Sequence, residues 1–129
     1  MRFENGNIVD LLACAEGKQL VAYGANSDLG RLCKQFSSYN LWERIDLITD
    51  KVTNSENFAY DGEQKQLIAF ETFCASLSPD SQCVILFTGI ACFVTCDLKR
   101  YNLPENTVFY IGEFLKHSPP PVQIVSVYV

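Results

Sequence analysis

The stretch from Leu20 to Arg31 contains the residues best suited to bind a ligand. An apolar run ends at Gly24, small and polar residues follow, and a helical pattern begins near Ser27. Glycine permits a tight turn at this point, and the first turn of a helix presents backbone N–H groups and a positive dipole end that suit a phosphate. The pattern therefore predicts a phosphate-binding turn formed by Gly24, Ala25, Asn26, Ser27 and Asp28.

Three further residues are predicted to join this site. Asp50 follows an Ile- and Leu-rich run and lies 20 residues after Gly30, close to where dinucleotide-binding domains place an acid that binds ribose hydroxyls. The alternative is that Asp50 begins a turn, as aspartate often does. Thr88 and Gly89 follow a second apolar run and predict a second strand-to-helix turn. If the strands before Gly24 and Thr88 are neighbours, both turns flank one crevice.

No catalytic residue and no metal site are predicted. The six cysteines form no Cys-x-x-Cys pair and the chain has one histidine, so a zinc site is not expected. Cys92, near the start of a predicted helix, is the best candidate for a nucleophile. The alternative is packing, because Cys92 and Cys96 have ordinary helical spacing and His117 lies in a separate Pro-rich segment.

The elements that must position these residues follow from the hydrophobic pattern. Helices are predicted over residues 7–15, 27–39, 71–77 and from 90 to about 101. Strands are predicted over residues 19–23, 44–49, 65–70, 83–88, 107–111 and 122–129, with a small hairpin near 58–60 in an otherwise exposed loop. Strands that alternate with helices predict an α/β fold, and we expect a Rossmann-like, mainly parallel open sheet of about five to six strands with helices on both faces. A single domain is expected over residues 1–129.

Two of these helices carry more specific expectations. Gly30 is expected to let the helix at 27–39 pack close to the strand at 19–23, as the third glycine of a dinucleotide-binding turn does. In the helix that begins at residue 90, Ile90 and Val94 are expected to share one side with Leu98.

Composition argues against several classes of function. A net charge of −5 disfavours a nucleic-acid-binding protein, and no cluster of Lys or Arg marks a membrane-binding surface. The uncharged stretch 83–96 has 14 residues, fewer than the ~20 that a membrane-spanning helix needs. The cysteines lie within apolar patterns, where free cysteine acts as a small hydrophobe, so a reducing, cytoplasmic location is expected.

The order and spacing of these elements resemble the small Rossmann-like N-terminal domain of bacterial sugar O-acyltransferases and related domains of polysaccharide-synthesis proteins. The likeness rests on a helix before Lys18–Ala25, a strand ending in Ile48–Asp50, the strand–helix pair at 66–73, and Val84–Thr88 followed by a helix, Pro104 and Val108–Tyr110. The resemblance implies a module that binds a nucleotide sugar and works beside a sugar-modifying partner enzyme. The acyltransferase part, a left-handed β-helix of hexapeptide repeats, is missing from this sequence, so no transferase activity is implied for the chain alone.

A second likeness is local. Residues 24–31 are similar to the cofactor turn of short-chain dehydrogenases, which adds an NAD-like nucleotide to the candidate ligands. That family uses a Tyr-x-x-x-Lys pair to move a proton, and here Tyr60 and Lys65 are five residues apart. The dehydrogenase activity is therefore not expected.

The sequence also supports an alternative function of a different class. The acyltransferase-related turn is usually Gly-x-Gly, and Asn26 replaces its second glycine. A degenerate Rossmann-like domain of this kind would serve as an interaction or structural module, with a partner enzyme or a second copy of the chain bound at an exposed strand edge.

Overall fold

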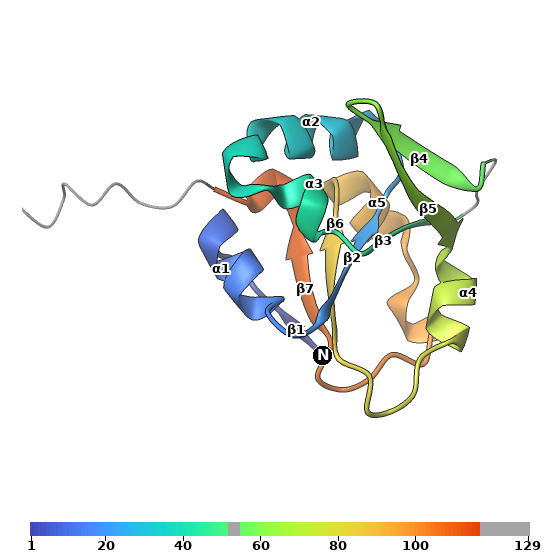
Figure 1. Cartoon of the computed structure of the whole chain (residues 1–129). Coiled ribbons are helices and arrows are strands. Elements are labelled where there is room, and N and C mark those ends of the chain that lie inside the picture. The colour runs from blue at the N-terminus through green and yellow to red at the C-terminus, as the bar shows by residue number, and fades with distance from the viewer. Residues whose placement is uncertain (52–54, 117–129) are drawn as a thin grey trace, which may run out of the picture.

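The computed structural model describes residues 1–51 and 55–116, and this part of the chain forms one sheet with helices on both faces (Figure 1). The predicted strand at 122–129 and His117 lie outside the described residues. Seven strands follow the order β1-β7-β6-β2-β3-β5-β4 in this described part. Their bounds are β1 Arg2–Phe3, β2 Gln19–Tyr23, β3 Leu47–Asp50, β4 Asn57–Tyr60, β5 Glu63–Ala69, β6 Cys83–Phe87 and β7 Val108–Ile111.

The sheet is mainly parallel, as predicted. All neighbouring strands run parallel except β4, which is antiparallel to β5. From β2 the chain moves outward through β3 to β5, and it then returns to the other side of β2 to form β6 and β7. The reversal between β2 and β6 creates the kind of switch point at which open α/β sheets bind ligands.

Five of the seven described strands correspond to the strands predicted from the hydrophobic pattern, and the other two, β1 and β4, lie at the edges of the sheet. β4 comes from the region where the sequence predicted a small hairpin, and it pairs with β5 through residues 57–60 and 63–66. β1 was not predicted, because two residues are too few to show a period-two pattern. It pairs with the far end of the described chain, with Arg2 opposite Val108 and Phe3 opposite Phe109.

One face of the sheet is covered by α1 (Ile8–Cys14), α2 (Ser27–Gln35) and α3 (Leu41–Arg44). Helix α1 begins with a capping box, in which the Asn7 side chain accepts from the Asp10 N–H and the Asp10 carboxylate accepts from the Asn7 N–H. Alternate strand residues, such as Leu20 and Ala22 of β2, point into this core. Burial of the apolar side of each helix therefore fixes these three helices on the sheet.

The other face is covered by α4 (Phe70–Ala75) and α5 (Ile90–Thr95), and its core is rich in aromatic side chains. The Tyr23 ring meets Phe70 edge-on at 4.8 Å between centroids and Phe87 at 5.2 Å. The Phe87 and Phe109 rings are stacked at 6.0 Å. Strands buried on both faces explain the nearly continuous apolar runs of β2 and β6.

The structure corrects the first long helix prediction and the strand that follows it. Helix α2 ends at Gln35, a short 3-10 turn follows at Ser37–Tyr39, and Asn40 takes a left-handed conformation (φ 58°) before α3. β3 accordingly starts at Leu47 rather than at residue 44. A Cβ built on Gly30 meets no atom within 4 Å, so this glycine does not serve the close helix–strand approach that the sequence suggested.

The structure also corrects the helix predicted from residue 90 to 101. Helix α5 ends at Thr95, and Leu98–Arg100 forms a separate 3-10 turn. Ile90 and Val94, which were expected on one side of a longer helix together with Leu98 and Tyr101, are 40% and 71% exposed. Isoleucine, valine and threonine lose side-chain freedom in a helix, and α5 has no side-chain cap at Gly89 to offset that cost.

Candidate functional site

The two predicted turns lie side by side at the carboxyl edge of the sheet. β2 and β6 pair in parallel with Tyr23 opposite Phe87, so Gly24 and Thr88 leave the sheet at the same level. The Thr88 N–H donates to the Tyr23 carbonyl at 3.0 Å, and the Thr88 hydroxyl donates to the Gly24 carbonyl at 3.0 Å. The condition set out for one shared edge, that these two strands are neighbours, is therefore met.

Gly24 is required where it stands. Its φ is +114°, a conformation that side chains other than hydrogen disfavour strongly. A Cβ at this position would also lie 2.2 Å from the Thr88 hydroxyl oxygen and 3.1 Å from the Cys92 sulfur. The glycine thus permits the first turn to pack directly on the second, besides permitting the tight change of direction.

Asn26 caps helix α2. Its side-chain oxygen accepts from the Asp28 N–H at 2.9 Å, while its own backbone is extended. Asn26 replaces the second glycine of the Gly-x-Gly turn found in the acyltransferase-related domains. Here it stabilises the start of α2. Within the part of the chain that the structure describes, the N–H groups of Asn26 and Ser27 have no hydrogen-bond partner.

Asp50 is the last residue of β3 and turns toward the first turn. One of its carboxylate oxygens accepts from the Ala25 N–H at 2.8 Å, and the other accepts from the Lys51 N–H at 2.7 Å. The sequence brought Ala25 and Asp50 into one site, and the structure places them in direct contact. This carboxylate holds one of the N–H groups that the sequence assigned to a phosphate.

Asp28 and Glu113 add two further carboxylates beside the second turn. Asp28 forms an ion pair with Arg31, one turn along α2. A Cβ built on Gly89 would lie 2.8 Å from an Asp28 oxygen and 3.3 Å from a Glu113 oxygen. The same Glu113 oxygen accepts from the Ile90 N–H at 3.1 Å. The N–H at the start of α5 is therefore occupied by a carboxylate of the chain itself.

Sequence reasoning missed Glu113. It lies in the 3-10 turn Gly112–Phe114 that follows β7, and only the pairing of β7 with β6 brings that turn to the Gly89 region. No local motif marks such a residue. The general rule that the carboxyl ends of parallel strands converge at one edge was the available signal, because β7 was itself predicted.

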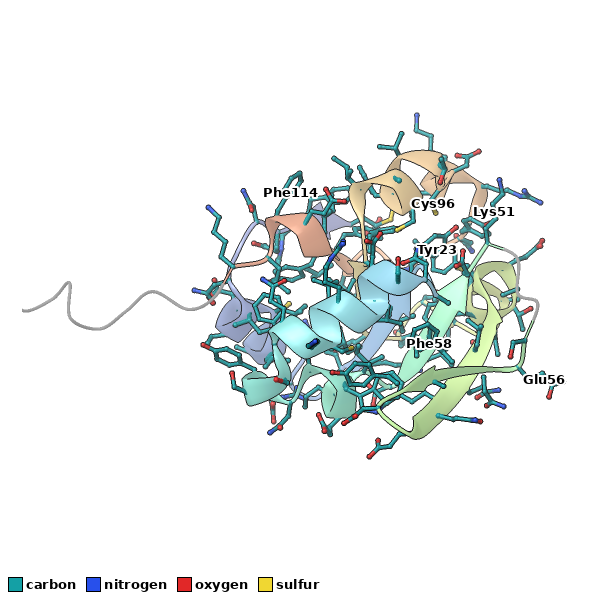
Figure 2. All side chains as sticks on the ribbon, turned by 90° about the horizontal axis from the view of Figure 1, so that it is seen from above. Tyr23, Lys51, Glu56, Phe58, Cys96 and Phe114 are labelled. Atoms are coloured by element: carbon teal, nitrogen blue, oxygen red, sulfur yellow. The ribbon has the colours of Figure 1, made fainter. Side chains whose placement is uncertain are left out.

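Tyr23 and Cys96 lie behind the first turn, on the α5 side, with Lys51 nearby (Figure 2). Burial raises the pKa of the Tyr23 hydroxyl, and the neighbouring Cys96 thiol raises it further. Burial also raises the pKa of Cys96, despite its hydrogen bond with Tyr23. Both groups are therefore neutral near pH 7 and are packed side chains rather than an acid–base pair.

Cys92 lies at the contact between the two turns. Its thiol donates to the Gly89 carbonyl at 3.0 Å and to the Tyr23 carbonyl at 3.4 Å. Both acceptors are backbone carbonyls of the two turns, and no histidine lies among the described residues to act as a base for this thiol. The packing interpretation of Cys92 fits this geometry better than the nucleophile interpretation.

Other features bear on what the chain can bind. All six cysteines fall within the described ranges, and each of them is free. Residues 1–51 and 55–116 hold no group of acidic, histidine or cysteine side chains arranged for a metal ion. In the same ranges no helix has the length and apolar character needed to span a bilayer.

Two concave sites lie at the opposite, amino end of the parallel strands. One, of about 400 Å³, is lined by residues 77–79 and 102–106, which precede β6 and β7. The other, of about 470 Å³, is lined by residues 15–18, 43, 44 and 46, which precede β2 and β3. Neither includes a residue of the two carboxyl-edge turns.

Comparisons with models of protein families, with curated proteins and with solved structures found no match to this chain. Its function is therefore inferred from the two turns and their surroundings.

Proposed function

We propose that this chain is a Rossmann-like domain that binds a nucleotide or nucleotide sugar between the ends of β2 and β6 and does not itself catalyse a reaction. The strand order supports this proposal. Apart from the two-residue edge strand β1, the parallel strands β5-β3-β2-β6-β7 follow the order 3-2-1-4-5 when they are renumbered along the chain. In this order dinucleotide-binding domains place their ligand beside the first strand.

The observation that carries the proposal is the pair of open N–H groups on Asn26 and Ser27. They stand at the start of the nine-residue helix α2, directly after the left-handed Gly24. Ser27 is exposed, so a ligand can reach this end of the helix. Two N–H groups at a positive helix end favour one phosphate group or another small anion.

The carboxylates around the turn favour the hydroxyl-rich part of such a ligand. A carboxylate oxygen has two lone pairs, so Asp50 can accept from a ribose hydroxyl while it holds the Ala25 N–H. Asp28 and Glu113 border the same edge and add negative charge. We therefore expect hydroxyl contacts of the ribose or sugar with Asp50 to add to the phosphate contact at the N–H groups of Asn26 and Ser27.

The same site is consistent with the likeness to sugar O-acyltransferase domains. In this proposal the module supplies a bound nucleotide sugar to a catalytic partner. An NAD-like nucleotide is the second ligand of this class, since its ribose and phosphate would use the same groups.

The second candidate function is an interaction module whose ligand site has degenerated. One specific observation favours it: Asp50 occupies the Ala25 N–H and Glu113 occupies the Ile90 N–H, so internal carboxylates stand where phosphate oxygens would bind. In that case the turn contacts serve folding alone.

A titration calorimetry screen tests the two candidates. The protein would be titrated with UDP-sugars, GDP-sugars, NAD, NADP, AMP and coenzyme A, and each ligand that binds would be retested on two variants. Ser27→Glu places a negative charge on the exposed first residue of α2, where it repels a phosphate and stabilises the helix. Ser38→Glu makes the same charge change at an exposed position beyond the end of α2.

The proposal predicts binding that Ser27→Glu weakens at least about tenfold and Ser38→Glu leaves unchanged. Equal binding by both variants would place the ligand elsewhere. No heat with any ligand at millimolar concentration would favour the interaction module.

A further inference from the structure

We propose that two copies of this chain associate through strand β1, so that the sheet continues across a two-fold axis near Phe3 and the two α5 helices lie on the same face of the joined sheet. This proposal is independent of the nucleotide site. It rests on the free edge of β1, on the exposed apolar side of α5, and on the charges that flank Phe3.

The edge of β1 offers backbone groups for pairing. Among residues 1–51 and 55–116, β1 is the last strand on its side of the sheet, and the N–H groups of Arg2 and Glu4 donate inward to Thr107 and Phe109 of the β7 segment at 3.0 and 2.9 Å. Successive residues of a strand direct their N–H and C=O groups to opposite sides. The N–H and C=O of Phe3 therefore point outward, as a self-complementary donor and acceptor.

The surface beside this edge is apolar and uncovered. α5 has the sequence Ile-Ala-Cys-Phe-Val-Thr, with no charged residue, and none of its residues is buried. Phe3 of β1 is 51% exposed and packs edge-on against Phe93 of α5, with the ring centroids 5.0 Å apart. Val94 of the same helix is 71% exposed. Phe3, Phe93 and Val94 are called the apolar patch of β1 and α5, and in the proposal a partner at the β1 edge covers it.

The charges next to Phe3 identify a second copy as the partner. Antiparallel pairing about a two-fold axis places Phe3 opposite Phe3 of the other copy, and therefore Arg2 opposite the other copy's Glu4. Both opposite-charge contacts form at once, and the Phe3 side chains meet on the α5 face. Within one chain Arg2 and Glu4 already form an ion pair at 2.5 Å, so the two side chains lie on one face of the strand.

The other edge of the sheet lacks this complementarity. β4 contains Asn57, Phe58, Ala59 and Tyr60 and has no charged residue. A symmetric pairing of β4 with itself would place no opposite charges across the axis. The charge pattern therefore selects β1 as the edge that recognises its own copy.

Sedimentation velocity over a range of about 2 to 500 µM tests the proposal, with protein whose N-terminus carries no tag. A short strand pair with one apolar patch is a small interface, and we expect a weak dimer with a Kd of about 10–100 µM. Val94→Asp, at a position 71% exposed, should weaken the dimer at least tenfold and keep the far-UV circular dichroism and the melting temperature unchanged. Val9→Asp is the control, because Val9 is 46% exposed and belongs to α1 on the opposite face.

A charge exchange separates this interface from any other. Arg2→Glu alone and Glu4→Arg alone should each be monomeric, because each places like charges opposite each other across the axis. An equimolar mixture of the two variants should form a heterodimer, since opposite charges then face each other at both positions. Mixing cannot restore the ion pair within a chain, so recovery on mixing is specific for contact between copies.

Three results would overturn the proposal. A wild-type chain that stays monomeric to 500 µM has no such dimer. A dimer that Arg2→Glu leaves intact uses another surface. Single variants that dissociate and do not recover on mixing show that the ion pair within one chain, rather than pairing of copies, was lost.

Discussion

The two strand-to-helix turns follow neighbouring strands, but the helices that they lead into differ in length, capping and burial. The first turn leads into α2, which has nine residues, an Asn26 cap and a buried apolar face. The second leads into α5, which has six residues, no side-chain cap and no buried residue. The first helix is specified by its own sequence and by its core, whereas the second depends on Cys92 and Phe93 and leaves its remaining apolar surface exposed. Similar topology thus gives one capped and well-packed helix and one short helix with an exposed apolar surface.

The largest expected effect is a loss of folding stability at alkaline pH, and it should involve both faces of the sheet. Burial raises the pKa of Cys33 on the α2 face to about 11 and that of Cys74 on the α4 face to about 12. In the unfolded chain these thiols ionise near 9.0. The unfolded state therefore loses protons first, and the stability present below pH 9 should be lost as the pH rises from about 9 to 12.

Urea unfolding at pH 8, 9.5 and 10.5, with a reducing agent present, measures this loss. A single transition whose midpoint falls at the higher pH values is expected if both faces unfold together. Two separate transitions would show that the α2 side and the α5 side are independent units. A midpoint that is constant to pH 10.5 would contradict the pKa shifts.

The next effect compares the buried side of α2 with the exposed side of α5. Leu29 is fully buried, so Leu29→Ala should lower the free energy of unfolding by about 2–5 kcal/mol. Val94→Ala removes a side chain that is 71% exposed. At low protein concentration it should change the free energy of unfolding by less than about 0.5 kcal/mol. Urea denaturation of both variants measures the difference. A comparable cost for Val94→Ala would mean that α5 is better packed than its exposure indicates.

The two turn glycines are expected to respond differently to alanine. Gly24→Ala should cost about 2–4 kcal/mol, because φ is +114° and the new Cβ meets the Thr88 hydroxyl at 2.2 Å. Gly89 has an ordinary φ of −150°. A Cβ there would meet the ends of two carboxylate side chains, which can move aside. The cost of Gly89→Ala should be at most about 1 kcal/mol. Equal costs, measured by urea denaturation, would show that backbone conformation does not distinguish the turns.

The smallest effects concern the local stability of α2. Asn26→Ala removes the side-chain acceptor for the Asp28 N–H and should cost about 1 kcal/mol. Gly30→Ala should stabilise the protein by about 0.5–1 kcal/mol, because Gly30 lies inside the helix and a Cβ there meets no atom within 4 Å. Thermal unfolding of the two variants should shift the midpoint in opposite directions. A destabilising Gly30→Ala would restore the close-packing role that the sequence suggested.

Much of the fold could be predicted because its signals are local. The apolar runs before Gly24 and at 83–88 each lie within one element, and the structure confirms strands at 19–23 and 83–87. From the sequence, the adjacency of these two strands was only a condition, and the structure supplies it. Helix α5 was predicted too long, because apolar spacing does not reveal whether a helix face is covered.

The site could be predicted only in part. The residues Gly24, Ala25, Asn26 and Asp50 do lie together, since strand ends converge at one edge. Their hydrogen bonds could not be read from the sequence, because the Asp50 contact to Ala25 depends on side-chain direction. Glu113 reaches the site only through the pairing of β7 with β6. Whether a nucleotide binds there stays a prediction.

The pairing of β1 with β7 also has a consequence for the order of events during synthesis. Phe3 pairs with Phe109, more than one hundred residues later in the chain. At a synthesis rate of about 5–20 residues per second, the first strand waits on the order of 5–20 s before its partner has been made. Throughout that interval the N–H groups of Arg2 and Glu4 lack their acceptors, the carbonyls of Thr107 and Phe109. β1 can therefore pair with β7 only late in synthesis, after nearly all of the described chain has been made.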